Sequence, residues 1–370
     1  MSPSKICRWG ILGTAGIARK NWDSIKNAGN ATLTAVASRS TERAQQYIDE
    51  CQSHVPHSPA PRAIGTYEGL LTAADVDAVY IPLPTGIRKE WVIRAAQAGK
   101  HVMVEKPVGC NAADVAEMIA ACRQHNVQFM DGVMFMHSAR LTKLREVLDD
   151  GESVGRIRRI SSAFTFCGPE AFHQANIRAS GELEPLGCLG DLGWYTIRFT
   201  LWTLNYQMPR RVSARMLSQS HRPDSKFDVP MEFSGELFFD GGVSATFYNS
   251  FLTENQQWGI IAGSKGFAQV TDFVLPFVGC EAAFTVHKAA FHVDGCDYSM
   301  EEHTRRHAVY EYSNNAPSAQ ESNLFRNFSE LVLRGKPDDF WADIALKTQQ
   351  VMDACLTSAR QDGKTIELSR

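Results

Sequence analysis

The sequence lacks long apolar runs and any excess of basic residues. Its longest apolar runs have the length of a strand, which is too short to span a bilayer. The opening residues, MSPSKICRWG, do not contain the apolar stretch of a secretory signal. A formal net charge of −3 provides no broad positive surface for nucleic acid or an anionic membrane. We therefore expect a protein that binds neither nucleic acid nor a membrane.

No C-x-x-C spacing occurs among the nine cysteines, which are scattered along the chain and odd in number. This pattern is typical of reduced, structural thiols in a cytosolic protein rather than of a disulfide or zinc framework. It predicts a cytoplasmic location.

One histidine pair deserves a test as a metal site. In EEHTRRH, His303 and His307 have the i, i+4 spacing of a helix, and Glu301 or Glu302 could assist them. The residues that follow, AVYEYS, are typical of a strand, which would keep the two imidazoles far apart. We therefore predict no metal site.

The chain is 370 residues long, so two domains are expected. Its first 130 residues alternate short apolar runs with amphipathic stretches. We predict strands at 7–12, 32–38, 78–83, 101–104 and 127–132, and helices near 16–28, 41–51, 87–98 and 112–125. Such alternation predicts parallel βαβ units in a doubly wound α/β (Rossmann) domain, with ligands at the carboxyl ends of its strands.

The pattern changes near residue 150, where runs with the period of antiparallel strands begin. Strands are predicted at 158–166, 210–217, 235–251 (with a turn at Asp240-Gly241-Gly242) and 267–273, and helices near 189–204, 317–334 and 341–361. The second domain is thus expected to be α+β, with a large open antiparallel sheet. We divide the chain into a dinucleotide-binding domain, 1–132, and a substrate-binding and oligomerisation domain, 133–370, whose last helix can pack back on the first.

The first predicted strand leads into WGILGTAGIA, which aligns with the dinucleotide fingerprint. Gly13 takes the first glycine position, Ala15 the second and Ala18 the third. Such a turn presents the N–H groups of a helix N-terminus to a diphosphate, whereas the alternative is a simple strand-to-helix turn. We expect Gly13, Thr14, Ala15, Ile17 and Ala18 to contact a dinucleotide.

The end of the second strand indicates which dinucleotide is bound. NAD-binding folds usually place a carboxylate there for the ribose 2′-hydroxyl, but this chain reads Ser38-Arg39-Ser40-Thr41-Glu42-Arg43. Arg39 and Arg43 could bracket a 2′-phosphate while Ser38 and Ser40 donate hydrogen bonds. The alternative is a solvated arginine pair. NADP is favoured, and NAD remains possible.

The stretch HVMVEKPVG delivers a lysine to the end of a buried strand. Pro107 restricts Lys106 to extended geometry, and the bond between them can be cis, which would fix the direction of the ammonium. At this place in the sheet Lys106 would point at the nicotinamide half of the cofactor. The alternative is a turn that merely ends the strand.

Four segments together carry a family resemblance: WGILGTAGIA, AVYIPLPT, AGKHVMVEKPVG and GDLGWY. They resemble the glucose–fructose oxidoreductase / inositol dehydrogenase (Gfo/Idh/MocA-type) family of NAD(P)-dependent oxidoreductases. Within that family the chain is most similar to the branch of dimeric dihydrodiol dehydrogenase and NADP-linked xylose dehydrogenases. The resemblance covers nearly the whole chain, and EKP followed by GDLGWY is its most specific part.

The resemblance implies that Lys106 is catalytic. It also implies that the loop after the fourth strand and the EKP turn contact the cofactor, through Leu83, Pro84, Thr85, Arg88, Glu105, Lys106 and Pro107. Arg88 stands where the family usually has histidine, so its role is left open.

A second candidate element is GDLGWYTIRFTLW. On a helix, Asp191, Tyr195 and Arg198 share one face. From the residues alone, a capping Asp191 with an ordinary half-buried Tyr195 is as good an explanation as a catalytic pair. The resemblance implies that Tyr195 is catalytic. With Asn176 and Arg178, Asp191 and Tyr195 are our candidate substrate-binding residues.

Together these features predict hydride transfer between a nicotinamide and a CH–OH group of a sugar or small polyol. Tyr195 is the candidate acid/base, because a neighbouring Lys106 ammonium would stabilise a phenolate. Asp191 is also a candidate catalytic residue, because it could orient the substrate. The resemblance implies a homodimer or higher homo-oligomer through the second domain's sheet. The alternatives are a non-catalytic NADP sensor and an enzyme that recycles a tightly held nucleotide.

Overall fold

The computed structural model describes residues 5–368, which form two compact units. The first unit contains the chain up to His137 together with Ser180–Pro185 and Asn314–Gln350. The second contains Ser138–Ala179, Leu186–Ser313 and the chain from Val351 onward. The sequence-based boundary lies at residue 132, with the last helix, 341–361, able to pack back on the first domain. In the structure, residues 180–185 and 314–350 belong to the first unit.

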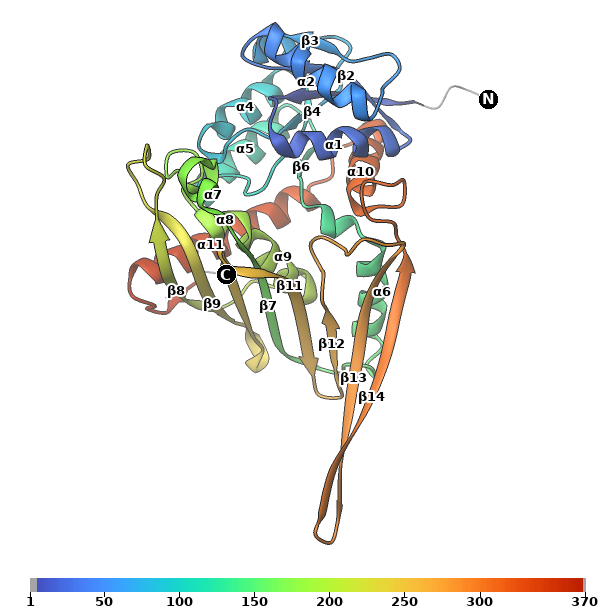
Figure 1. Ribbon diagram of the computed structural model, residues 1–370, viewed down its shortest axis with the longest axis vertical. Coiled ribbons are helices and arrows are strands. Elements are labelled where there is room, and N and C mark those ends of the chain that lie inside the picture. The colour runs from blue at the N-terminus through green and yellow to red at the C-terminus, as the bar shows by residue number, and fades with distance from the viewer. Residues whose placement is uncertain (1–4, 369–370) are drawn as a thin grey trace. The chain divides into compact units, whose positions relative to one another are not determined.

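The first unit is built on a parallel sheet of six strands in the order β3-β2-β1-β4-β5-β6 (Figure 1). These strands are β1 (Cys7–Leu12), β2 (Ala31–Ala37), β3 (Arg62–Ile64), β4 (Ala78–Ile81), β5 (His101–Val104) and β6 (Phe129–Asp131). This order confirms the predicted doubly wound Rossmann fold. The short strand β3, in a proline-rich stretch, was not predicted.

Helices α1 to α5 connect these strands, and the first unit also contains a 3₁₀ turn after β6 and a helix from late in the chain. They are α1 (Gly16–Asn27), α2 (Thr41–His54), α3 (Tyr67–Leu71), α4 (Thr85–Gln97), α5 (Ala112–Gln124), the 3₁₀ turn η1 (Met134–His137) and α10 (Gln320–Arg334). Local residues begin and end these helices. The side chain of Asn111 accepts a hydrogen bond from the N–H of Asp114 at the start of α5, and Gly335 ends α10 in the left-handed backbone conformation (φ 72°).

Helix α10 completes the core of the first unit although it follows β1 by some three hundred residues. The Trp9 ring lies 5.0 Å from the rings of both Phe325 and Phe328. Its indole Nε1 donates a hydrogen bond to Ser329 Oγ at 3.0 Å. Trp9 and both phenylalanines are fully buried. The apolar face of β1 is therefore covered by a segment that the chain supplies only near its end.

The second unit contains a nine-stranded sheet in the order β14-β13-β12-β11-β7-β10-β9-β8-β15. Its strands are β7 (Ile157–Cys167), β8 (Arg211–Ser220), β9 (Val229–Phe238), β10 (Ser244–Ser250), β11 (Leu252–Gly263), β12 (Phe267–Val270), β13 (Glu281–Asp294), β14 (Asp297–Tyr310) and β15 (Ile366–Glu367). Neighbouring strands are antiparallel except β7 and β10, which are parallel, so the sheet is mixed rather than purely antiparallel. The predicted turn at Asp240-Gly241-Gly242 joins β9 to β10, with positive φ at both glycines.

The remaining helices are α6 (Ala139–Asp149), α7 (Glu170–Ala175), α8 (Gly187–Asp191), α9 (Gly193–Thr203) and α11 (Phe340–Arg360), with 3₁₀ turns η2 (Ile177–Ala179) and η3 (Asp240–Gly242). Helix α11 begins in the first unit and ends in the second. The single helix predicted over 189–204 is divided at Leu192 into α8 and α9. A side chain at Gly193 would lie 2.9 Å from Leu189 and 3.2 Å from the amide of Asn249, so the division brings this backbone close to β10. Within residues 5–368, no helix is both long and apolar enough to cross a membrane.

Candidate functional site

The turn from β1 to α1 requires glycine at its first position. Gly13 has φ 111°, and a Cβ there would lie 2.9 Å from the side chain of Leu83. Its N–H donates to the carbonyl of Ala37 at 2.9 Å, which ties the tip of β1 to that of β2. Helix α1 follows with Ala15 at its N-cap and no acidic residue in its first turn. This helix N-terminus therefore offers N–H groups and a positive dipole end without a competing carboxylate.

At the end of β2, hydroxyl and guanidinium groups gather beside this turn. Thr14 Oγ1 lies 3.5 Å from Ser38 Oγ, and Arg43 Nε donates to Thr14 Oγ1 at 3.3 Å. The hydroxyl of Ser40 caps α2 by accepting from the N–H of Arg43 at 3.2 Å. Arg39 is exposed at the strand tip. The group is cationic and rich in donors, as the recognition of a phosphate requires.

Tyr67 belongs to the same group, although the sequence did not point to it. Burial raises the pKa of the Tyr67 phenol, while Arg39 and Arg43 act in the opposite direction. Its ring packs edge-on against Trp91 at 4.8 Å. This tyrosine stands at the start of a short helix outside every recognised motif, so only the folded chain brings it to the two arginines.

The carboxylate of Glu105 is buried inside the first unit and helps to hold the EKP turn. It is buried and accepts a hydrogen bond from the hydroxyl of Tyr80, which in turn accepts from the amide of Asn21 at 2.6 Å. Burial, followed by the neighbouring Glu105 charge, raises the pKa of Tyr80 well above its usual value. Gly132 leaves the space that this carboxylate needs, because a Cβ there would lie 3.2 Å from Glu105 Oε1.

Arg88 binds main-chain carbonyls at the tips of two strands. Its side chain is buried, and Nε donates to the carbonyl of Leu83 at 2.9 Å. Nη1 donates to the carbonyl of Glu105 at 2.8 Å and also to that of Pro107. Burial lowers the pKa of Arg88, and the charges of Glu184 and Glu105 oppose that effect. The guanidinium therefore joins the loop after β4 to both ends of the turn that carries Lys106.

Lys106 lies half-buried between these two carbonyls, at the carboxyl end of β5. Its peptide bond to Pro107 is cis. Its N–H donates to Glu105 Oε2 at 3.2 Å. The backbone on both sides of the lysine is thus held by buried side chains of the first unit.

Thr85 hydrogen-bonds to a returning segment of the chain. Its N–H donates to Glu184 Oε1 at 3.0 Å and its hydroxyl to Glu184 Oε2 at 2.6 Å. The N–H of Gly86 donates to the carbonyl of Leu183 at 2.9 Å. The carboxylate of Glu184 therefore caps the N-terminus of α4, which its charge also favours. No sequence pattern indicated this contact, because Glu184 lies about a hundred residues beyond Thr85.

In the second unit, three of the predicted substrate-binding residues lie together. Arg178 Nε forms an ion pair with Asp191 Oδ2 at 2.8 Å, and Asn176 Oδ1 accepts from the N–H of Arg178 at 3.0 Å. Asp191 is the last residue of α8, and Tyr195 lies in the first turn of α9. The Tyr195 ring packs edge-on against Phe164, with centroids 5.5 Å apart. The cluster of Asn176, Arg178 and Asp191 offers hydrogen-bond donors and acceptors to a polar ligand.

Two family models match this chain. The model described as "Oxidoreductase family, NAD-binding Rossmann fold" covers residues 7–133, and the "GFO/IDH/MocA C-terminal domain" covers residues 141–269. The chain belongs to the GFO/IDH/MocA family. The resemblance seen in the sequence is thereby confirmed, and the protein is a nicotinamide-dependent oxidoreductase.

Proteins of several known activities are similar to this GFO/IDH/MocA chain. The D-xylose 1-dehydrogenase (NADP(+)) 2 of Haloferax volcanii is 32% identical over 68% of this chain and 71% of that protein. The trans-1,2-dihydrobenzene-1,2-diol dehydrogenase of Mus musculus is 29% identical over 73% and 76% of the two chains. The structure of a 3-ketoreductase from Actinomadura kijaniata, in complex with NADP and TDP-benzene, has a TM-score of 0.80 at 25% identity and covers 96% of this chain and 98% of that one.

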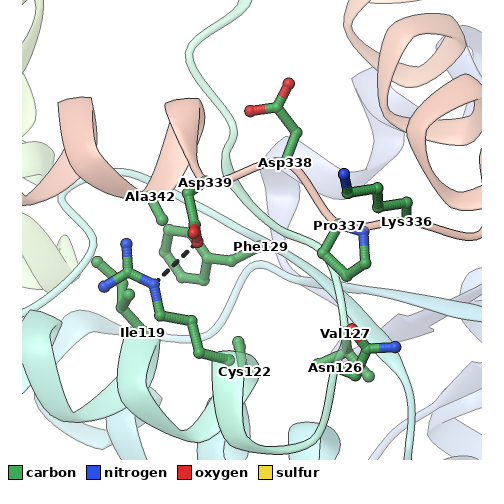
Figure 2. A pocket seen from close by; sticks show the side chains of 11 residues that line it. Ile119, Cys122, Asn126, Val127, Phe129, Lys336, Pro337, Asp338, Asp339 and Ala342 are labelled. Carbon is green, nitrogen blue, oxygen red and sulfur yellow. Dashed lines mark hydrogen bonds and ion pairs between the residues drawn. The ribbon is translucent and has the colours of Figure 1, made fainter.

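A separate pocket of about 370 Å³ lies elsewhere in the first unit of this GFO/IDH/MocA protein (Figure 2). It is lined by the end of α5, by Phe129 at the start of β6 and by the segment 336–342. Arg123 in its wall is paired with Asp339 at 2.8 Å and with Asp343 at 2.7 Å. The strands are parallel, so all of them start on the same side of the sheet. The pocket at the start of β6 therefore lies at the amino ends of the strands, whereas Gly13 and Lys106 lie at the carboxyl ends. We assign no chemistry to this pocket.

The histidine pair of EEHTRRH lies on β14, as the following residues predicted. His303 contacts Glu301 at 3.2 Å, and His307 stacks on Phe284 instead. Over the described range 5–368, no three His, Cys, Asp or Glu side chains are placed to hold a metal ion.

Proposed function

We propose that this protein is an NADP-dependent dehydrogenase or reductase that interconverts a CH–OH group and a carbonyl on a sugar or small polyol. The observation that carries the proposal is the strand-tip Lys106, whose flanking carbonyls are bound by Arg88, in a chain of this oxidoreductase family. The relatives' activities, on xylose, on a diol and on a nucleotide-linked keto sugar, all concern such groups.

The first unit is proposed to hold the cofactor. The N-terminus of α1 fits a pyrophosphate, since Gly13 permits the turn and no carboxylate stands in the first turn. Arg39, Arg43 and Ser38 fit a ribose 2′-phosphate at the end of β2. Each charge-assisted hydrogen bond contributes about 1.5–3 kcal/mol, so this group favours NADP over NAD.

When bound, the nicotinamide supplies the site that gives or accepts hydride. In the proposed mechanism Tyr195 removes the hydroxyl proton of the alcohol during oxidation and returns it during reduction. Lys106 holds the reacting oxygen with its ammonium, which stabilises negative charge on that oxygen and on the phenolate. Asp191, oriented by its ion pair with Arg178, accepts hydrogen bonds from neighbouring hydroxyls of the substrate.

Purified protein incubated with NADP⁺ and a panel of aldoses, inositols and trans-diols tests the proposal through absorbance near 340 nm. We expect turnover with NADP⁺ to exceed that with NAD⁺ at least tenfold. Lys106→Ala should lower kcat about 10²–10⁴-fold. Its NADPH affinity, measured by fluorescence titration, should change far less. NADPH binding without turnover of any substrate would contradict the proposal and favour a sensor.

We further propose a cytoplasmic location and a homo-oligomer formed through the sheet of the second unit. The nine cysteines all lie within residues 5–368 and form no disulfide, which suits a reducing compartment. Along β11 and β12 the two faces differ: Ile261 and Ala268 are buried, whereas Trp258, Ile260 and Phe267 are half-exposed on the other face. A monodisperse monomer at micromolar concentration in light scattering would contradict the oligomer.

A further inference from the structure

Strand β14 forms an edge of the nine-stranded sheet, and together with β13 it extends well beyond β12. It pairs with β13 along fourteen consecutive residues, from Asp297 to Tyr310, without a bulge. On the other side of β13, β12 pairs only with 285–287, so residues 288–294 have β14 as their one partner strand among residues 5–368. Figure 1 shows the two strands continuing together past the end of β12. We call residues 288–303 the arm.

The arm has one apolar face that is exposed. Phe291 lies opposite Met300, and Val293 lies opposite Tyr298, so the four side chains share a face. Their exposed fractions are 61%, 65%, 55% and 66% respectively. A two-stranded ribbon is at best marginally stable by itself in water, and a patch of this kind usually marks a contact surface. A further strand beside the arm would therefore stabilise it.

The outer edge of β14 lacks most of the features that normally block pairing, although it carries charged side chains of both signs. Edge strands are usually protected by proline, lysine, a bulge or short length. Strand β14, DYSMEEHTRRHAVY, has no proline, glycine or lysine and keeps regular register with β13 over its whole length. Every second residue turns its N–H and C=O away from β13. This edge is thus suited to receive another strand.

The order of charges in β14 indicates which strand fits. Glu301 and Glu302 precede Thr304, and Arg305 and Arg306 follow it. A strand with this order is complementary to itself when the two copies run antiparallel, because each acidic half then faces a basic half. A two-fold axis makes such a contact closed and symmetric.

The register follows from the individual pairs. With the axis at Thr304, Glu302 faces Arg306 and Glu301 faces His307 of the second copy, and Tyr298 faces Tyr310. With the axis at His303, Glu301 would face Arg305, but Met300 would face Arg306 and Glu302 would face Thr304. That register keeps one acidic–basic pair and loses the pairing of Tyr298 with Tyr310. Opposite charges and aromatic pairs across strands stabilise a sheet, so the axis at Thr304 is favoured.

We propose that β14 pairs antiparallel with β14 of a second copy of this chain, about a two-fold axis at Thr304. Residues 298–303 of each arm then pair with residues 305–310 of the other copy, and the arm becomes part of a four-stranded ribbon. This assignment rests on the second unit alone and is independent of the proposed enzymatic activity.

Charge reversal tests the contact by sedimentation or light scattering across a concentration series. Glu302→Arg and Arg306→Glu should each weaken association at least tenfold, because every dimer contains the pair twice. The double variant, with both changes, should regain most of the association. Glu367→Arg, on the opposite edge strand β15, is the matched control and should leave association unchanged. Thermal unfolding of each variant shows whether the fold is kept.

The double variant separates contacts between copies from contacts within one. Within the chain, Glu302 pairs with His287 at 3.0 Å and Arg306 with Glu281 at 2.7 Å. If only these pairs within one chain mattered, the double variant would associate more weakly than either single variant. That result, or an assembly that no single reversal weakens, would overturn the proposal.

Disulfide trapping tests the register. Thr304→Cys should form a disulfide with its own copy in the dimer, identified by mass spectrometry of the linked peptides so that native cysteines do not confuse the result. His303→Cys is the matched control, since it faces Arg305 in the proposed register. Preferential linkage through position 303 would contradict the axis at Thr304, and a wild-type monomer at all concentrations would contradict the pairing itself.

Discussion

At the scale of single residues, the clearest feature is that Arg88 binds backbone rather than a ligand. Its guanidinium hydrogen-bonds to the carbonyls of Leu83, Glu105 and Pro107. The family resemblance placed this position in the cofactor loop but could not define what an arginine does there. Because Lys106 lies between two of these carbonyls, Arg88 acts on the lysine by positioning its backbone.

Arg88→Met should therefore lower both stability and activity. It leaves buried carbonyls without donors, and each unsatisfied group costs about 1–3 kcal/mol. Arg88→Lys should recover part of the stability but less of kcat, because an ammonium cannot span the same three carbonyls. Thermal unfolding and steady-state kinetics measure the two effects. A fall in Tm with unchanged kcat in both variants would contradict a positioning role.

The two arginines after β2 give a second prediction at this scale. Arg43→Ala and Arg39→Ala should each raise the KM or Kd for NADPH about tenfold or more while changing NADH binding little. Arg19→Ala is a matched control, because Arg19 lies on α1 and pairs with Glu50. Equal effects on both cofactors would show that the arginines do not contact the 2′-phosphate.

At the scale of elements, the βαβ units were predictable because each strand and helix has a local period. The strand 7–12 and the helix that starts at Gly16 agree with their predicted limits. The helix predicted over 189–204 proved to be two, because Gly193 allows close approach to β10. Strands β11 and β13 were not predicted, and only the end of β14, from Ala308 onward, was recognised as a strand from its sequence.

The pairing of β5 with β6 predicts a pH dependence of stability. His101 Nδ1 accepts a hydrogen bond from the N–H of Gln128 at 2.9 Å, and burial lowers the pKa of His101, with Asp77 opposing. The unfolded chain therefore binds this proton at a higher pH than the native chain. The contribution to stability is present above pH of about 6.5 and is lost as the pH falls below it.

We expect the Tm of the wild type to fall between pH 7 and pH 5, and His101→Gln to lose less over the same range. Glutamine is chosen because its carbonyl can still accept the Gln128 hydrogen bond. Burial also lowers the pKa of His57. The His101→Gln variant should therefore still lose some Tm at acid pH, but less than the wild type does. Parallel Tm-versus-pH curves for the two proteins would contradict the role of His101.

At the scale of the whole molecule, the first unit is assembled from segments far apart in the sequence. Residues 180–185 supply the carboxylate that caps α4, and α10 supplies the aromatic rings that cover Trp9. The first unit therefore cannot form fully until most of the chain is available.

Phe325→Ala should cost about 3–5 kcal/mol in the free energy of unfolding, as expected for removal of a fully buried ring. Phe277→Ala, at a side chain that is 64% exposed, should change it by less than about 0.5 kcal/mol. Urea unfolding of both variants provides the comparison. An equal, small effect would mean that α10 contributes little to the core around Trp9.

The sequence by itself determined the Rossmann order of strands and helices, and it placed Gly13 in the first turn and Lys106 at a strand end. It also indicated the family. These features depend on local backbone geometry and on side-chain periodicity within one segment, which any stretch of chain carries in itself. Only the tertiary structure decided what Arg88 and Glu184 bind, which helix covers Trp9, and that β14 is left at an open edge. Those outcomes depend on contacts between residues far apart along the chain, where no local preference distinguishes one partner from another.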